Sequence, residues 1–268
     1  MNSVIVVQAR LGSSRLPGKV LLTAAGRPLL AHMLQRVRAA RYAEHVVVAT
    51  TIDRADDAIA LLCAELGVDC YRGDPLDCLD RHYRVGEAAR ADAVVKIPSD
   101  CPLIDPAVID RVLSTYAALG GGVDFVSNLD PPSWPDGNDV EVMSMSALRA
   151  AAHEATRAFD REHTTPFIRL RPDRFRSHNV RWETGLDYSH SLRFVVDWPE
   201  DYAVIRELIE TLEPIHGPLF DVETILQLVR ERPELSEQNA MHRGYSHWKA
   251  NANAALHLTD TASKENRV

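Results

Sequence analysis

The apolar, largely β-branched run at residues 3–9 is the feature that most restricts how this chain can fold. Residues 4–7 are Val, Ile, Val and Val in succession, so both faces of a strand built from them would be apolar. Such a strand is stable only where helices cover both sides of the sheet, which is typical of parallel sheets. The run therefore predicts a central strand of an α/β domain.

Strand and helix patterns alternate through the first 119 residues. Pro28 suits a first helical turn, and the apolar residues after it recur at helical spacing. We also expect strands at 45–51, 69–72 and 93–98, and helices from about 54 to Gly67, from about 76 after Asp74, and from Pro106 to about 119 with Asp105 as cap. Short strands separated by helices imply right-handed crossovers. The pattern predicts a three-layer, mostly parallel, Rossmann-like sheet.

The rhythm changes at the three glycines 120–122. Strand patterns then cluster at 123–127, 139–144, 174–180 and 192–196, with a helix expected at 145–158 and later helices at 199–213 and 221–231. We expect one domain over 1–235 with a small insertion lobe at about 128–185. Residues 236–268 would form a C-terminal appendage, and the polar tail after 250 is typical of a disordered segment.

Composition narrows the class of function. The 268 residues carry a formal net charge of −8, which argues against a broad nucleic-acid surface because such a surface needs a basic field. No apolar run approaches the roughly 18 residues that span a bilayer, and the N-terminus has no signal-peptide layout. We therefore expect a cytoplasmic protein with no membrane contact. The four cysteines show no CxxC pair, which predicts neither a zinc site nor a disulfide framework.

Basic residues are concentrated at the N-terminus. Residues 1–43 contain seven Arg or Lys and no Asp or Glu, which favours a compact anion as ligand. We expect three of these, Arg36, Arg38 and Arg41, to form a solvated helix face. Of the remaining four, Arg10, Arg15 and Lys19 lie in the loop that follows the first strand.

The loop at residues 10–19 would emerge at the carboxyl end of the first strand, where open α/β sheets bind their ligands. Gly12 and Gly18 permit a close backbone approach, and the basic side chains Arg10, Arg15 and Lys19 can surround phosphate oxygens. A Walker A loop does not match, because five residues separate the two glycines and Val follows the lysine; GxGxxG is also absent. A tight turn with solvated basic residues is the alternative.

Two aspartates follow predicted strands that are far apart in the sequence. Asp100 comes after the strand at 93–98, and Asp197 comes after the apolar segment at 192–196. Strand ends of this kind meet at one sheet edge, and Mg²⁺ is commonly held by one or two carboxylates together with phosphate oxygens. We expect a Mg²⁺ pair, with turn or helix-cap aspartates as the alternative.

The stretch "QARLGSSRLPGKVLL" resembles the signature loop of the sugar-activating cytidylyltransferases, and most closely that of the SpsF-type spore-coat polysaccharide biosynthesis proteins. The similarity continues through "DPLDCLDRHY", "SDCPLIDP", "NDVEVMS", "REHTTPFI" and "FVVDWPEDY". The resemblance implies a GT-A-like nucleotidyltransferase fold, and a homodimer. It also implies transfer of CMP from CTP to a small acidic acceptor such as a sugar acid, with Mg²⁺ as cofactor.

The resemblance implies roles for particular residues. The catalytic residues would be Arg15, Lys19 and Asp100, and the metal ligands Asp100 and Asp197. Nucleotide binding would involve Ala9, Arg10, Leu11, Gly12, Ser13, Arg15, Lys19, Pro98 and Ser99. Ser99 departs from the family, which usually has Gly there, and residues 107–190 match the sugar-acid synthetases poorly outside these motifs.

Several residues are candidates for acceptor binding. Asp139 and Glu141 lie two apart on an expected strand and so share a face, where they can bind acceptor hydroxyls or an amino group, or simply be solvated. His163 can donate to an acceptor carboxylate or phosphate, or make a structural hydrogen bond. Trp134 suits an acceptor pocket or a dimer contact. For His82 and Tyr83, on a helix, we expect packing.

Two other functions stay open from the sequence. A nucleotide-sugar-dependent glycosyltransferase also pairs a nucleotide with acidic metal ligands, although no Asp-x-Asp follows a strand here. A non-catalytic nucleotide-binding protein would keep the loop without turnover. The acceptor itself can be a sugar acid, a sugar phosphate or a phosphonate, because fold class does not fix a substrate.

Overall fold

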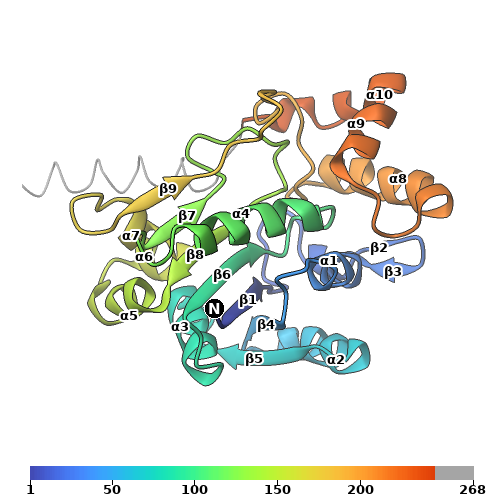
Figure 1. Ribbon diagram of the computed structural model, residues 1–268. Coiled ribbons are helices and arrows are strands. Elements are labelled where there is room, and N and C mark those ends of the chain that lie inside the picture. The colour runs from blue at the N-terminus through green and yellow to red at the C-terminus, as the bar shows by residue number, and fades with distance from the viewer. Residues whose placement is uncertain (245–268) are drawn as a thin grey trace, which may run out of the picture.

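The computed structural model describes residues 1–244, which contain a seven-stranded sheet in the order β5-β4-β1-β6-β8-β7-β9 (Figure 1). The strands of this sheet are β1 (Ser3–Gln8), β4 (His45–Thr51), β5 (Asp69–Gly73), β6 (Ala93–Pro98), β7 (Phe125–Ser127), β8 (Glu141–Ser144) and β9 (Ser177–Asn179). Two short strands, β2 (Thr23–Ala24) and β3 (Arg27–Pro28), pair separately.

The sheet is mostly parallel, as the sequence predicts. Strand β1 pairs in parallel with both β4 and β6, and β4 pairs in parallel with β5. Strand β8 is antiparallel to both of its neighbours, β6 and β7, and β7 runs parallel to β9. Because β1 occupies the centre of the parallel half, its apolar residues are fully enclosed.

Helices cover both faces of the sheet. The α-helices of residues 1–244 are α1 (Leu29–Arg38), α2 (Asp57–Leu66), α3 (Cys78–Ala88), α4 (Pro106–Ala118), α5 (Met145–Glu154), α6 (Ala158–His163), α7 (Pro166–Arg169), α8 (Pro199–His216), α9 (Val222–Glu231) and α10 (Glu234–Glu237). Ile5 and Val7 pack in the core with α1, α2 and α4, whereas Val4 and Val6 pack with α3 and α5. The predicted three-layer arrangement is confirmed, and α8 and α9 build a further cluster beside it.

Local capping explains where two helices begin. Asp105 accepts a hydrogen bond from the Ala107 backbone at 2.8 Å, so the predicted cap of α4 is confirmed. Helix α3 starts at Cys78, later than expected, because Asp77 and not Asp74 caps it by accepting from the Asp80 backbone at 2.8 Å.

Two predicted elements differ from the structure. Residues 192–196 do not form a strand; they make a single bridge, between Arg193 and Asp136, and the Val196 backbone donates to the Asp100 carbonyl at 2.8 Å. The helix expected at 145–158 is two helices, α5 and α6. The backbone is extended at Arg157, whose side chain instead binds Asp160 at 2.7 Å.

Arg36 corrects the expectation of a solvated basic face on α1. Its guanidinium is buried and donates to the carbonyls of Ile104, Pro218 and Phe220 at 2.9, 2.8 and 2.5 Å. These carbonyls meet near the N-terminus of α9, where one guanidinium can donate hydrogen bonds to all three. Arg38 and Arg41 are exposed, as expected.

No helix within residues 1–244 is long and apolar enough to cross a membrane. The tail expected to be disordered after residue 250 lies outside the described residues. Strands β8 and β9, which fall in the proposed lobe at 128–185, belong to the main sheet. The division into a domain at 1–235 with a lobe and an appendage stays a prediction.

Gly86 of α3 packs closely against β6 and the start of α5, which generates a prediction about stability. A Cβ there would come within 2.6 Å of the Val94 side chain and 2.8 Å of the Met145 sulfur. Alanine favours a helix by about 1 kcal/mol over glycine, but overpacking costs about 1–3 kcal/mol. We expect overpacking to exceed the helix gain, so Gly86→Ala should lower the free energy of unfolding, measured with urea, by up to about 2 kcal/mol. An unchanged or higher stability would contradict this packing.

Candidate active site

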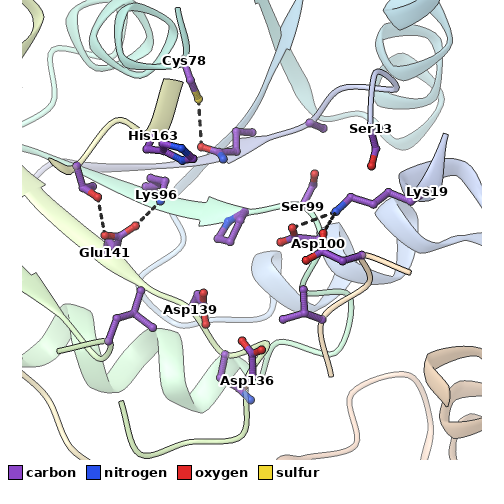
Figure 2. A pocket seen from close by; sticks show the side chains of 18 of the residues that line it. Ser13, Lys19, Cys78, Lys96, Ser99, Asp100, Asp136, Asp139, Glu141 and His163 are labelled. Carbon is purple, nitrogen blue, oxygen red and sulfur yellow. Dashed lines mark hydrogen bonds and ion pairs between the residues drawn. The ribbon is translucent and has the colours of Figure 1, made fainter. Parts of the chain in front are cut away.

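A cavity of about 580 Å³ opens at the carboxyl ends of β1 and β6. Figure 2 shows its side chains converging from the first loop, from the end of β6 and from the segment before β8. The predicted site residues that line it are Ala9, Arg10, Gly12, Ser13, Arg15, Lys19, Pro98, Ser99, Asp100, Asp139, Glu141, His163 and Asp197. Leu11 does not line it, because its side chain packs against the hydrophobic core.

The register of the sheet brings the first loop and Asp100 together. Gln8, the last residue of β1, lies opposite Pro98, the last residue of β6, so the segments that follow them leave the sheet side by side. Within the loop, the Gly18 backbone donates to the Leu11 carbonyl at 3.0 Å, and Gly18 adopts a φ of 71° that favours glycine. This turn delivers Lys19 to the cavity.

Asp56 anchors the loop from the neighbouring strand end, and sequence reasoning missed it. Its carboxylate, which is buried, accepts from the Leu11 backbone at 2.7 Å and from the Thr51 hydroxyl. The sequence marks Asp56 only as one of several acidic residues near the start of α2. Its role depends on the packing of β4 against β1.

Lys19 lies between the two predicted metal ligands. Its ammonium nitrogen is 3.1 Å from Asp100 Oδ2 and 2.9 Å from Asp197 Oδ1. Burial opposes the charge, yet the two carboxylates together hold the pKa of Lys19 above its ordinary value. The two aspartates therefore meet at one point, as the sequence predicts, with a cation between them, although only Asp100 follows a strand.

Asp197 also receives the Arg15 guanidinium, at 2.6 Å. Burial alone would raise the pKa of Asp197, but Lys19 and Arg15 hold it well below the usual range. This carboxylate is therefore ionised at neutral pH, and its negative charge is stabilised by the two loop cations.

A second acidic pair, Asp136 and Asp139, faces the same cavity (Figure 2). Burial and the neighbouring carboxylates Asp100 and Asp197 raise the pKa of Asp136 to about 6, against the opposing effect of Arg193. Burial together with Asp136 and Asp100 raises the pKa of Asp139 to about 8. The site thus holds more acidic groups than its cations offset.

Arg193 and Asp201 stand behind Asp197, and sequence reasoning missed both. Arg193 contacts Asp136 at 2.8 Å, Asp197 at 3.0 Å and Asp201 at 3.0 Å. Asp201 is the third residue of α8, and its Oδ2 accepts from the Asp197 and Trp198 backbones at 3.0 and 3.1 Å. A carboxylate three residues after the N-cap Trp198, with Pro199 as the first helical residue, is the signal that could have found Asp201.

The far end of the cavity is built around Glu141, which is buried. Glu141 pairs with Lys96, accepts from the Thr165 hydroxyl at 2.8 Å and lies 3.4 Å from Arg169. Burial opposes its charge, but Lys96 and Arg169 hold the pKa of Glu141 below its ordinary value. Two cations thus surround one carboxylate. The alternative of a solvated strand face does not hold for this residue.

His163 lies beside this group, at the turn between α6 and α7 (Figure 2). The next residue, Thr164, is buried and has a φ of 71°, an unusual conformation outside glycine. The Thr165 backbone donates to the His163 carbonyl at 2.8 Å, which closes this tight turn.

Trp134 lines the cavity and stacks on Trp182, with ring centroids 5.9 Å apart. Of the two alternatives from the sequence, its position supports the pocket. His82 and Tyr83 are buried on α3, which confirms the packing expected of them. The cysteines at 63, 70, 78 and 101 are free thiols.

Within residues 1–244, no group of three or more His, Cys, Asp and Glu side chains is arranged to hold a metal ion by itself. Asp100 and Asp197 offer two carboxylates. An ion that keeps waters and takes phosphate oxygens needs no more from a protein, and Mg²⁺ binds in this way.

The raised pKa of Asp139 predicts a pH dependence of stability. Between the unfolded pKa of about 3.9 and the folded pKa of about 8, the unfolded chain is ionised while the folded protein keeps the proton. Stability is therefore lost as the pH rises through this range. The measurement is urea unfolding at pH 5 and pH 8 without divalent metal. The free energy of unfolding of Asp139→Asn, relative to that of the native protein, should rise by at least about 1 kcal/mol from pH 5 to pH 8.

The control for this measurement is Asp69→Asn, because Asp69 is exposed and outside the cavity. Its stability relative to the native protein should be the same at both pH values. Parallel pH curves for Asp139→Asn and the native protein would contradict the assignment.

The sequence model of a family described as "Cytidylyltransferase" matches residues 4–243. An uncharacterized protein of Methanocaldococcus jannaschii is 31% identical and covers 92% of this chain and 98% of its own. The spore coat polysaccharide biosynthesis protein SpsF of Bacillus subtilis is 28% identical, covering 89% and 98%. A 3-deoxy-manno-octulosonate cytidylyltransferase of Anaeromyxobacter sp. is 30% identical, covering 76% and 96%.

Solved structures agree with the fold. A cytidylyltransferase from Leptospira borgpetersenii superposes with a TM-score of 0.83 at 27% identity, covering 92% of this chain and 100% of its own. A CMP:2-keto-3-deoxy-manno-octonic acid synthetase complexed with CTP has the same fold, with a TM-score of 0.58 at 18% identity over 78% and 98% of the two chains. Because the family match extends over nearly all the described residues, this chain belongs to the cytidylyltransferases, which are nucleotidyltransferase enzymes.

Proposed function

We propose that this enzyme transfers CMP from CTP to a sugar acid, with release of pyrophosphate, during assembly of a surface polysaccharide. One observation carries the proposal: Lys19, at the end of a glycine-containing basic loop, lies between the carboxylates of Asp100 and Asp197 in a large cavity. Phosphate-binding cations and metal-binding carboxylates then meet at one place, as nucleotidyl transfer requires.

In the proposed reaction an acceptor oxygen attacks the α-phosphorus of CTP, and the bond from that phosphorus to the pyrophosphate oxygen breaks. Arg15 and Lys19 would bind phosphate oxygens and stabilise the charge that develops on pyrophosphate. Ala9, Arg10, Gly12 and Ser13, with Pro98 and Ser99, are proposed to hold the nucleotide. Leu11 is not included, because its side chain packs against the core and its backbone groups bind within the loop and to Asp56. No side-chain nucleophile is required, because positioning and charge stabilisation dominate such transfers.

Asp100 and Asp197 are proposed to hold Mg²⁺. The charge of the site fits a divalent cation, since four carboxyl groups contact only three basic side chains: Asp100, Asp136, Asp197 and Asp201 against Arg15, Lys19 and Arg193. Bound Mg²⁺ would neutralise charge on the α-phosphate and lower the pKa of the acceptor hydroxyl.

An acidic acceptor suits the opposite end of the cavity. Lys96 and Arg169 both line this end of the cavity and both contact Glu141. Arg169 also lies 3.7 Å from Asp130, but that carboxylate is exposed to solvent, so an acidic acceptor can take its place. The relative that acts on 3-deoxy-manno-octulosonate supports a sugar acid over a sugar phosphate or a phosphonate. SpsF supports a place in polysaccharide biosynthesis.

The cytoplasmic location and the homodimer expected from the sequence stay predictions. Light scattering of the purified protein would measure its molar mass and so test for the dimer.

The test is pyrophosphate release from CTP, UTP, ATP or GTP, each with 3-deoxy-manno-octulosonate, N-acetylneuraminate, a sugar 1-phosphate or a phosphonate. We expect release only with CTP and a sugar acid, and only with a divalent metal. Absence of release from CTP with every acceptor, or equal use of all four nucleotides, would refute the proposal.

Asp100→Asn tests the metal assignment in the same assay. Losing one fixed charge at the reacting centre should lower kcat by about 100-fold or more. Asp69→Asn, at an exposed position outside the cavity, is the matched control and should keep full activity. Full activity of Asp100→Asn would remove Asp100 from the metal site.

A further inference from the structure

Arg193 is the most enclosed cation at the site, and it joins three carboxylates. Its side chain is 2% exposed, compared with 12% for Lys19 and 19% for Arg15. Its Nη2 donates to Asp197 Oδ2 at 3.0 Å, its Nη1 to Asp136 at 2.8 Å and its Nε to Asp201 at 3.0 Å. Only a planar, branched donor group can serve three acceptors in this arrangement.

The Asp201 end of this chain of contacts is fixed to the fold. Asp201 is fully buried and accepts two backbone N–H groups at the start of α8. Asn239, also buried, donates to Asp201 Oδ1 at 2.9 Å and to the Arg193 carbonyl at 3.0 Å. The guanidinium therefore binds Asp201, at the start of α8, through Nε and binds Asp197 through Nη2.

The two oxygens of Asp197 have different partners. Oδ1 receives Arg15 and Lys19, the loop cations that are proposed to bind phosphate, whereas Oδ2 receives Arg193. Loss of the loop cations to a nucleotide would leave the Arg193 contact in place. Arg193 can thus keep the carboxylate oriented when its other oxygen turns to a new ligand.

The third donor of Arg193 binds Asp136, which lines the cavity. Asp136 is tied to the same segment by its backbone, which donates to the Leu192 carbonyl at 3.1 Å and accepts from Phe194 at 2.7 Å. Gly137 has a φ of 111°, and a Cβ there would come within 2.7 Å of the Phe194 carbonyl oxygen. The loop that carries Asp136 and Asp139 is therefore held against the segment that carries Arg193.

We propose that Arg193 is a positioning residue that fixes the Asp197 carboxylate for a divalent cation, using Asp201 and Asn239 as its anchor. The inference rests on the proposed function, because that function places the cation at Asp100 and Asp197. Arg193 itself would touch neither the metal nor the reacting atoms. Its effect is on the orientation of a ligand, and partners of this kind typically change metal affinity by about 10–100-fold.

The experiment measures CTP binding by calorimetry at a series of Mg²⁺ concentrations, on the full chain, without acceptor. Its readout is the Mg²⁺ concentration that gives half of the maximal CTP affinity. Arg193→Lys keeps the positive charge but replaces the planar guanidinium, with its several donors, by a single ammonium. We expect it to raise that Mg²⁺ concentration by about 10–100-fold. Asn239→Ala, which loosens the anchor, should shift it in the same direction and serves if Arg193→Lys does not fold.

Arg36→Lys is the matched control, since Arg36 is equally buried, binds three carbonyls and lies outside the cavity. It should lower the melting temperature and leave the Mg²⁺ dependence unchanged. A folded Arg193→Lys protein with the native Mg²⁺ dependence would overturn the inference alone. Native protein that binds CTP equally well with Mg²⁺ and with chelator would overturn the metal assignment, and this inference with it.

Discussion

Lys19 is shared by two carboxylates that come from residues 100 and 197, and this contact requires most of the fold to be in place. The lysine arrives through a turn anchored by Asp56, Asp100 follows the strand that pairs with β1, and Asp197 precedes α8. Three segments far apart in the sequence therefore have to meet to within hydrogen-bond distance. A cation held in this way keeps two like charges together.

Charge divides the cavity into two ends. The end beside the first loop holds a surplus of carboxyl groups, and the raised pKa values of Asp136 and Asp139 reflect both burial and that surplus. The end around Glu141 presents two cations to the cavity, Lys96 and Arg169. Under the proposed function, a divalent cation with its triphosphate would occupy the first end and an acidic acceptor the second. One cavity would then present two anions to each other across a metal.

The sequence predicts the parts that depend on local pattern. The buried strand at residues 3–9 and the cap at Asp105 follow from periodicity and capping. Asp100 and Asp197 meet as predicted, but not as two strand ends, because residues 192–196 form no strand and reach Asp100 through the Val196 backbone. Arg193 was not predicted, because it lies inside an apolar stretch that resembles a strand and its three partners are known only from the fold. Arg36 was misassigned to the surface for a similar reason, since the carbonyls that bind it lie near residues 104 and 218–220. Polar groups buried by distant segments leave little local signal.

Thermal stabilisation by nucleotides tests the central claim most directly, because a ligand that binds only the folded protein raises its melting temperature by mass action. The measurement compares CTP, UTP, ATP and GTP, each with Mg²⁺ and with chelator. The account predicts the largest shift with CTP and Mg²⁺ and a much smaller one with CTP and chelator. Equal shifts with all four nucleotides, or no shift with CTP and Mg²⁺, would contradict a metal-dependent CTP site between Lys19, Asp100 and Asp197.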